Sequence, residues 1–70
     1  MKITLYGAEG CPMCAALASM MKRKHIEFEK IEDIDYIISL GLNSIPMIEL
    51  ENGERLDYPG ALKYLKTLGA

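Results

Sequence analysis

Hydrophobic and polar positions alternate over residues 2–6, KITLY, at the start of the chain. A period of two predicts a strand, with Ile3 and Leu5 on one face and Tyr6 on the other. The pattern changes to helical spacing over residues 12–24, where the leading proline suits the first turn of a helix. Four positions of this helix recur every three or four residues and are expected to face the core. They are Cys14, Leu17, Ala18 and Met21.

The middle of the chain continues to switch between the two periods. HIEFEKI at residues 25–31 alternates, which predicts a half-buried strand. Residues 32–40 predict a short helix that Gly41 closes, with three isoleucines on its apolar side. They are Ile34, Ile37 and Ile38. SIPMIEL at residues 44–50 predicts a third strand that opens at Pro46, a position that tolerates proline.

The end of the chain reads as a hairpin followed by a helix. Asn52-Gly53 is a strong hairpin signal, so residues 54–57 are expected to form a fourth strand, antiparallel to the third. Pro59 opens the last helix, and Asp57 is placed to cap it. Its core positions are Ala61, Leu62, Leu65 and Leu68.

These elements follow the order β-α-β-α-β-β-α. The order predicts an α/β fold with a four-stranded mixed sheet flanked by three helices. Strands joined through a helix are expected to be parallel. Because the chain has only 70 residues, we expect one domain over residues 1–70 with a marginal core.

Composition and charge exclude several classes of function. The net charge is −2 with both signs mixed, which does not fit a nucleic-acid-binding surface. The short basic run at residues 22–24 suits a helix end. No apolar stretch approaches the ~20 residues that span a bilayer, and the first apolar run is shorter than the roughly 7–15 residues of a signal peptide. We therefore expect a soluble, cytoplasmic protein that binds neither membrane nor nucleic acid.

The sequence GAEGCPMCAAL holds both cysteines, Cys11 and Cys14. Attack on a disulfide requires a thiolate, and a helix N-terminus favours ionisation of a thiol. Cys11 is expected at or beside the N-cap, and Cys14 about one turn inside on the buried face. Cys11 would then attack a substrate disulfide and Cys14 would resolve the mixed disulfide. Glu9 opposes ionisation, so a moderate lowering of the pKa of Cys11 is expected.

Two other roles for the cysteine pair stay open on this evidence. Two thiolates are half of the ligands of a structural zinc site, and His25 lies about 16 Å away along the helix. A thiolate metal-binding module, carrying copper(I) or a zinc ion shared in a dimer, remains an alternative. Small copper chaperones also place such a pair after a first strand, but in the order β-α-β-β-α-β. A purely structural disulfide would close a very small loop and stabilise little.

CPMC at the start of a helix and SIPMIEL before a hairpin resemble the glutaredoxins, small proteins of the thioredoxin-fold superfamily. The resemblance covers nearly the whole chain. IEFEK and IDYIISLGLNSIPMIEL look most like the NrdH-redoxin branch, whose members reduce ribonucleotide reductase and are recharged by thioredoxin reductase. The resemblance implies a thioredoxin fold and a small dithiol–disulfide oxidoreductase, an electron carrier in cell redox homeostasis.

The resemblance also assigns roles to individual residues. It implies that Cys11 is the nucleophile, Cys14 the resolving thiol, and Pro46 a cis proline facing them. A cis bond there would turn the backbone of Ile45 toward an extended substrate strand. The substrate-binding residues expected on this basis are Pro12, Met13, Ile45, Pro46 and Tyr58. The protein would act as a monomer on protein disulfides, with ribonucleotide reductase as one candidate, and would hold no metal or permanent cofactor.

The source of electrons is left open by three departures from the glutaredoxin pattern. Ala8 replaces a lysine, Met13 replaces a tyrosine, and RLDYPGAL at residues 55–62 replaces Gly-Gly and an acidic pair. Most groups that hold the carboxylates of glutathione are therefore missing. Of the GFRP-like stretch of NrdH-redoxins, LDYP keeps only the proline. Glutathione and thioredoxin reductase both remain candidate donors.

Overall fold

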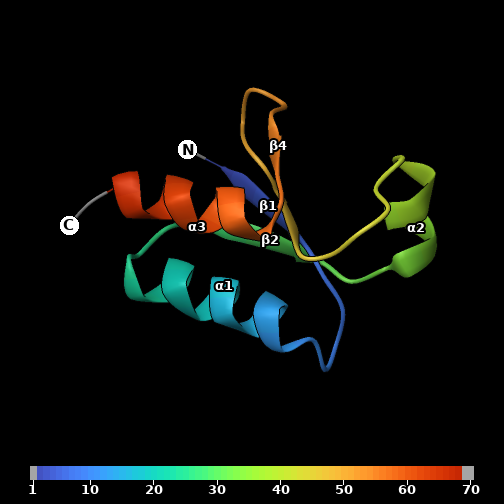
Figure 1. Cartoon of the computed structure of the whole chain (residues 1–70), viewed down its shortest axis with the longest axis horizontal. Coiled ribbons are helices and arrows are strands. Elements are labelled where there is room, and N and C mark those ends of the chain that lie inside the picture. Colours follow the sequence, from blue (N-terminus) through green and yellow to red (C-terminus); the bar gives the residue numbers. More distant parts are fainter. Residues whose placement is uncertain (1, 69–70) are drawn as a thin grey trace.

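Four strands and three helices follow one another in the predicted order over residues 2–68, the part of the chain that the computed structural model describes (Figure 1). The strands are β1 (Ile3–Tyr6), β2 (Phe28–Ile31), β3 (Met47–Glu49) and β4 (Arg55–Leu56). The helices are α1 (Pro12–Arg23), α2 (Ile34–Ser39) and α3 (Tyr58–Thr67). The prediction of one domain also covers residues 1, 69 and 70, which lie outside the described residues.

The strands form one mixed sheet in the order β2-β1-β3-β4, as predicted. Strand β1 runs parallel to β2, with Ile3 opposite Phe28. It runs antiparallel to β3, with Tyr6 opposite Met47. Strand β4 is antiparallel to β3 and completes the hairpin.

The prediction that strands joined through a helix are parallel was wrong for β2 and β3, which run in opposite directions. Helix α2 connects them, and it lies at the end of the sheet where β1 and β2 finish (Figure 1). Its six residues extend only about 9 Å at a rise of 1.5 Å per residue. Because this helix does not carry the chain back along the sheet, β3 starts where β2 ends and reverses direction.

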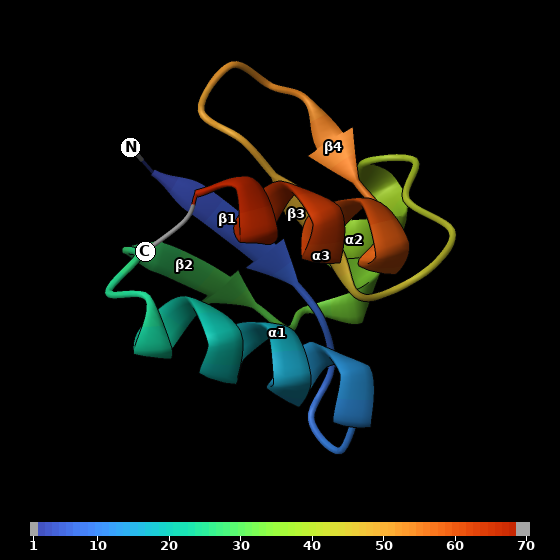
Figure 2. The same ribbon diagram turned by 60° about the vertical axis from the view of Figure 1, so that its left-hand side comes forward.

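Helices α1 and α3 lie side by side over one face of the sheet (Figure 2). The main core fills the space between them and the sheet, and the predicted inward positions of α1 other than Cys14 all belong to it. Its fully buried large side chains include Ile3, Leu5, Leu17, Met21, Ile48 and Leu65. The alternation of β1 sends Tyr6 to the opposite face, where it packs in a smaller cluster with Ile37 and Leu42.

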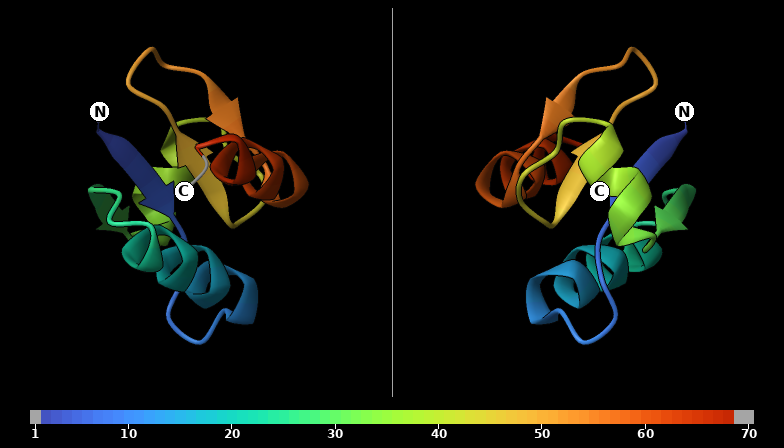
Figure 3. Two further views of the ribbon diagram at one scale, coloured as in Figure 1. Left: turned by 90° about the vertical axis from the view of Figure 1, so that its left-hand side faces the viewer. Right: turned by 90° about the vertical axis from the view of Figure 1, so that its right-hand side faces the viewer.

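Helix α2 buries less than its sequence predicts. Of its three isoleucines only Ile37 is buried, whereas Ile34 and Ile38 are 44% and 63% exposed. The end-on views in Figure 3 show this helix at one end of the molecule, away from the C-terminal ends of α1 and α3. Because the helix packs against the small cluster around Tyr6 and Leu42 rather than along the sheet, only its Ile37 side chain is buried in that contact. The three isoleucines do share one apolar side of the helix, as predicted, but in the described chain only Ile37 is buried there.

The second strand begins later than predicted, because the end of α1 uses the residues before it. His25 adopts a left-handed conformation, with φ at 56°. Its N–H donates to the carbonyl of Lys22 at 3.1 Å, and the N–H of Ile26 donates to that of Met21 at 2.9 Å. These two bonds form a Schellman cap. Residues 25–27 are thus occupied in ending the helix, and β2 starts at Phe28.

Three predicted turns and caps are confirmed. Gly41, after α2, and Gly53, in the hairpin, have φ of 84° and 90°, values that glycine adopts without steric cost. The N–H of Gly60 donates to Asp57 Oδ1 at 2.9 Å, so Asp57 caps α3. Among residues 2–68 no helix has the length and hydrophobicity needed to cross a membrane.

Candidate active site

Cys11 is the N-cap of α1, as the sequence predicts, and Pro12 occupies the first turn. The Cys11 Sγ accepts a hydrogen bond from the N–H of Cys14 at 3.2 Å. The N–H of Cys11 itself donates to the carbonyl of Ala8 at 3.3 Å, which closes the loop before the helix. The side chain of Cys11 is partly exposed. This sulfur is therefore held by backbone donors of a helix N-terminus and is still open to a reaction partner.

Cys14 lies one turn further along α1 and is only 1% exposed. Its sulfur packs against the backbone of Gly7, just after β1. A Cβ on Gly7 would lie 2.8 Å from the Cys14 Sγ and 3.0 Å from its Cβ. Real Cβ atoms do not approach sulfur so closely, so the loop can pass this side chain only because residue 7 is glycine.

The pKa values of the two thiols are shifted in opposite directions. A hydrogen bond from the Cys14 thiol lowers the pKa of Cys11, and the backbone N–H groups of Cys14 and Met13 lower it further, against an opposing desolvation. Burial raises the pKa of Cys14, and its hydrogen bond to Cys11 adds to the rise. This confirms the predicted direction for both thiols. Glu9 is not among the groups that shift the pKa of Cys11, and desolvation takes the opposing role expected of it.

Lys30 was not among the predicted site residues. Its charge acts on Cys14 and lowers the pKa of that thiol, as does a hydrogen bond from the Ala8 backbone. Lys30 on β2 is paired with Leu5 on the parallel strand β1. Leu5 precedes Gly7, the residue in contact with Cys14, by two positions. The signal that locates it is therefore the register of two strands rather than any local motif.

The peptide bond between Ile45 and Pro46 is cis, as the resemblance implies. Tyr6 and Met47 are the last pair between β1 and β3. Beyond this pair, the next residue after β1 is Gly7 and the residue before β3 is Pro46. Neighbouring strands stand about 5 Å apart at such positions. Pro46 therefore follows the sheet to the place where Gly7 contacts Cys14, which brings the two predicted motifs to one end of the sheet.

The remaining predicted substrate-binding residues lie in different surroundings. Met13, between the cysteines, is 47% exposed, and Pro12 is also exposed. Ile45 is partly buried and packs against the smaller core cluster. Tyr58 begins α3 and packs, partly buried, against the main core. Within residues 2–68, no three side chains of the histidine, cysteine or carboxylate types come close enough to share a metal ion.

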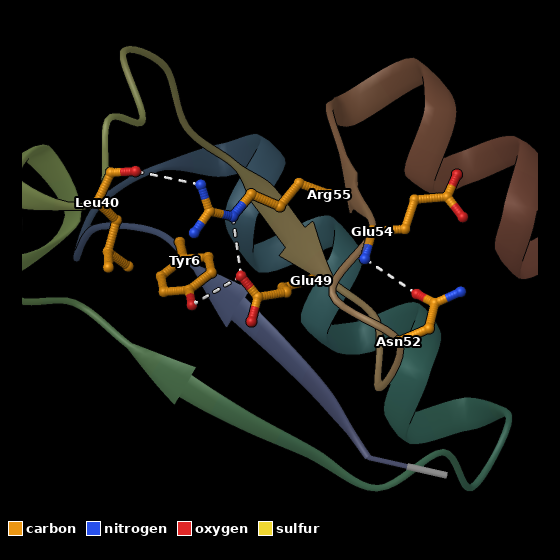
Figure 4. A network of polar contacts seen from close by, with 6 residues as sticks. All are labelled: Tyr6, Leu40, Glu49, Asn52, Glu54 and Arg55. Carbon is orange, nitrogen blue, oxygen red and sulfur yellow. Dashed lines mark hydrogen bonds and ion pairs between the residues drawn. The ribbon is translucent and has the colours of Figure 1, made fainter.

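A polar cluster on the other face of the sheet fixes the segment that follows α2 (Figure 4). Arg55 Nε donates to Glu49 Oε1 at 2.8 Å, and Tyr6 Oη donates to the same oxygen at 3.5 Å. A second nitrogen of Arg55 donates to the carbonyl of Leu40 at 3.1 Å. Burial and the nearby Glu49 raise the pKa of Tyr6. The cluster joins β1, β3 and β4 to the end of α2. Nothing in the sequence analysis pointed to it.

Asn52, the asparagine of the predicted hairpin, stabilises the turn between β3 and β4 (Figure 4). Asn52 Oδ1 accepts a hydrogen bond from the N–H of Glu54 at 2.9 Å. The N–H of Leu50 donates to the carbonyl of Glu54 at 2.8 Å and closes the turn. These bonds confirm the hairpin that Asn52-Gly53 predicts, and they end β3 at Glu49.

Neither a protein-family model nor a curated protein matches the chain. Solved structures match it. A glutathione S-transferase from Xanthobacter autotrophicus Py2 aligns with 90% of the chain at a TM-score of 0.71 and 19% identity, and the chain spans 36% of that protein. Thioredoxin 1 from the thermophilic eubacterium Thermosipho africanus TCF52B aligns over 100% of both chains, with a TM-score of 0.59 and 17% identity.

A malarial protein aligns with 99% of the chain and 97% of its own length, at a TM-score of 0.60 and 14% identity. At such low identities these likenesses show the fold alone. The chain has the thioredoxin-type fold that the sequence predicts, with a four-stranded mixed sheet and three helices.

Proposed function

We propose that this protein is a small dithiol–disulfide oxidoreductase that reduces disulfides in other proteins. The observation that carries the proposal is the N-cap position of Cys11, where the hydrogen bond from Cys14 lowers the pKa of an accessible thiol. Cys14 is buried beside it, and its pKa is raised. One sulfur is thus suited to attack a partner, and the other is kept back as a thiol until it is needed.

The first step is attack of the Cys11 thiolate on one sulfur of the substrate disulfide. A bond forms between that sulfur and Cys11 Sγ, and the substrate S–S bond breaks. The other substrate sulfur leaves as a thiolate and takes a proton from water. The product is a mixed disulfide between protein and substrate.

The second step is attack of Cys14 on the Cys11 sulfur. Two causes of the raised pKa of Cys14 are its hydrogen bond to Cys11 and the charge on Cys11. Both end when Cys11 enters the mixed disulfide, whereas the Ala8 backbone and Lys30 still favour the Cys14 thiolate. Cys14 loses its proton, a bond forms between Cys14 and Cys11, and the bond between Cys11 and the substrate breaks. The second substrate sulfur leaves as a thiolate and takes up a proton, so that no net proton is left over. The substrate gains two electrons, and the cysteine pair loses them.

The substrate strand lies across the cis-proline segment in this proposal. Ile45 offers its backbone to an extended chain, and the exposed Pro12 and Met13 form the apolar surface around the cysteines. Pro46 is itself buried and supports the backbone at Ile45. Tyr58, which begins α3, is also assigned to substrate binding. The protein works as a monomer in the reducing cytoplasm without a permanent cofactor or metal.

The reductant is glutathione or thioredoxin reductase, as in the glutaredoxins and the NrdH-redoxin branch that the sequence resembles. Ribonucleotide reductase is a candidate substrate on the same resemblance. The departures at Ala8 and Met13 favour a protein reductase over glutathione, because the expected partners of the glutathione carboxylates are absent.

The test supplies the oxidised protein separately with thioredoxin reductase and with glutathione plus glutathione reductase, and follows loss of NADPH in the presence of a protein disulfide. Turnover with at least one donor is expected, and Cys11→Ser should abolish it. Cys14→Ser should still attack once and accumulate the mixed disulfide, which mass spectrometry detects. A Cys11→Ser variant with full activity would overturn the site assignment. A reduced protein that fails to reduce any disulfide in a single turnover would overturn the proposed function itself.

A further inference from the structure

An apolar groove lies between α2 and the segment that leads to Pro46. Its apolar lining consists of Ile34, Ile37, Ile38, Leu42 and Ile45. The groove has a volume of about 270 Å³. Small-molecule pockets start at roughly 300 Å³, so this groove is of a size for one large side chain rather than a cofactor.

Two of the lining isoleucines are exposed to water without a partner in the described chain. Ile38 is 63% exposed and Ile34 is 44% exposed. Exposed apolar area costs about 25 cal/mol per Å² relative to burial, and contiguous exposed patches mark interaction sites. The groove is therefore a surface on which an apolar group gains binding free energy.

The groove shares Ile45 with the proposed substrate-binding site. Ile45 lines it and is also the residue whose backbone is assigned to the substrate strand. Pro46 follows directly, at the position where the sheet leads to Gly7 and Cys14. A chain that lies along Ile45 with its disulfide at Cys11 therefore passes the mouth of the groove.

Two carboxylates lie on α2 beside the residues that line the groove. Successive residues of a helix are rotated by about 100°, so Asp33 and Asp35 fall on the two sides of the stripe formed by Ile34, Ile37 and Ile38. Asp33 caps α2 through a hydrogen bond from Tyr36 N–H at 3.2 Å. In the part of the chain that the structure describes, neither aspartate takes part in an ion pair. The two sides of α2 that flank the groove-lining isoleucines thus carry negative charge, and we refer to them as the rim of the groove.

We propose that this groove binds a large apolar side chain of the protein substrate, next to a basic residue that faces Asp33 or Asp35. This inference rests on the proposed function and names the class of substrate for the same site. Glutathione fits it poorly, because its two carboxylates are repelled by the rim and it has no large apolar side chain. The groove thus selects a cationic, apolar polypeptide segment beside the disulfide.

The test uses the full chain, reduced beforehand and freed of reductant, in single-turnover reactions with peptides that contain one internal disulfide. The peptides carry Leu-Lys, Ser-Lys or Leu-Glu beside the disulfide, on either side in separate series. The rate with 2-hydroxyethyl disulfide measures the thiol–disulfide exchange alone, because this small neutral substrate has no apolar side chain to place in the groove. In at least one series, Leu-Lys should be reduced about tenfold faster than either other peptide, as expected for one well-buried side chain.

Variants locate the effect. Ile38→Gln should slow the Leu-Lys peptide to the rate of the Ser-Lys peptide. The double variant Asp33→Asn, Asp35→Asn should remove the preference of lysine over glutamate, and asparagine at position 33 can still cap the helix. Tyr36→Gln is the matched control, because Tyr36 is exposed on the same helix but does not line the groove. All three variants should reduce 2-hydroxyethyl disulfide within twofold of the parent rate.

Equal rates for all peptides, with normal reduction of 2-hydroxyethyl disulfide, would overturn the docking proposal and leave the proposed function standing. Failure to reduce even the small disulfide would instead overturn the proposed function, and the docking proposal with it. Analytical ultracentrifugation of the reduced protein tests whether a second copy of the chain occupies the groove instead. A dimer that Ile38→Gln dissociates would assign the groove to a second copy of the chain and overturn the proposal.

Discussion

The backbone of Gly7 lies directly against the sulfur of Cys14, so closely that a methyl group on residue 7 would stand 2.8 Å from it. The contact joins the end of β1 to the first turn of α1. It also fixes the depth at which the buried thiol sits behind Cys11. The position of the buried Cys14 thiol is thus set by the loop that follows β1 as well as by its own helix.

Gly7→Ala should therefore displace Cys14 and destabilise the fold. The added methyl group has to move either the helix or the loop, and overpacking of this kind typically costs about 1–3 kcal/mol. Urea unfolding of the reduced protein measures the loss. Resolution of the mixed disulfide should also slow, because the added methyl group displaces the Cys14 sulfur from its position beside Cys11.

The double variant Gly7→Ala, Cys14→Ala is the control for that prediction. Removing the sulfur relieves the closest contact but leaves the Cys14 Cβ, which would stand 3.0 Å from the new methyl group. The double variant should therefore lose less stability than the two single changes added together. Strict additivity would show that residue 7 and the sulfur do not interact.

The acidity of Cys11 depends first on its neighbour. The hydrogen bond from Cys14 is the largest cause of its lowered pKa. Cys14→Ala should therefore raise the pKa of Cys11, although the backbone N–H groups of the helix still keep it from rising fully. The pH dependence of alkylation by iodoacetamide measures this, since only the thiolate reacts. In the native dithiol protein, reaction at Cys11 should set in at lower pH than reaction at Cys14. A midpoint unchanged by Cys14→Ala would contradict the assigned cause.

The site around Cys11 could be predicted because its geometry is local. A proline in the first turn, a cysteine before it and apolar spacing after it fix a helix start, and both thiols then take their positions. The caps at Gly41 and Asp57 follow equally short patterns. Pro46 needed more than local pattern, and it was assigned only through its resemblance to a known arrangement.

The features that escaped prediction all depend on which strands become neighbours. Lys30 acts on Cys14 through the pairing of β1 with β2, and Tyr6 meets Glu49 and Arg55 only once β1, β3 and β4 are in register. The exposure of Ile38 follows from the position of α2 at the end of the sheet. Helical spacing indicates which side of a helix is apolar, but it does not indicate how much of that side another element covers.

Arg55→Gln should loosen α2 without unfolding the rest of the protein. The change removes the hydrogen bond to the Leu40 carbonyl and the ion pair with Glu49, the contacts that tie the end of this helix to the sheet. Amide hydrogen exchange by NMR should show α2 exchanging about fivefold faster relative to α1. Lys2→Gln is the control, because the Lys2–Glu29 pair is long at 3.8 Å and more exposed. Equal changes in both helices would contradict a local role for Arg55.

Asp57→Ala should destabilise the protein through α3 alone. The carboxylate accepts the Gly60 N–H at 2.9 Å, and the loss of such a cap costs about 1 kcal/mol. Asp57→Ser should restore most of the stability, because a serine hydroxyl can accept the same bond. Urea unfolding of the three proteins, monitored by circular dichroism, gives the comparison. Since α3 packs against α1 but contributes no thiol, the single-turnover rate with 2-hydroxyethyl disulfide should stay unchanged in both variants at low urea. A serine variant as unstable as the alanine variant would show that charge at this position, rather than the cap, stabilises the helix.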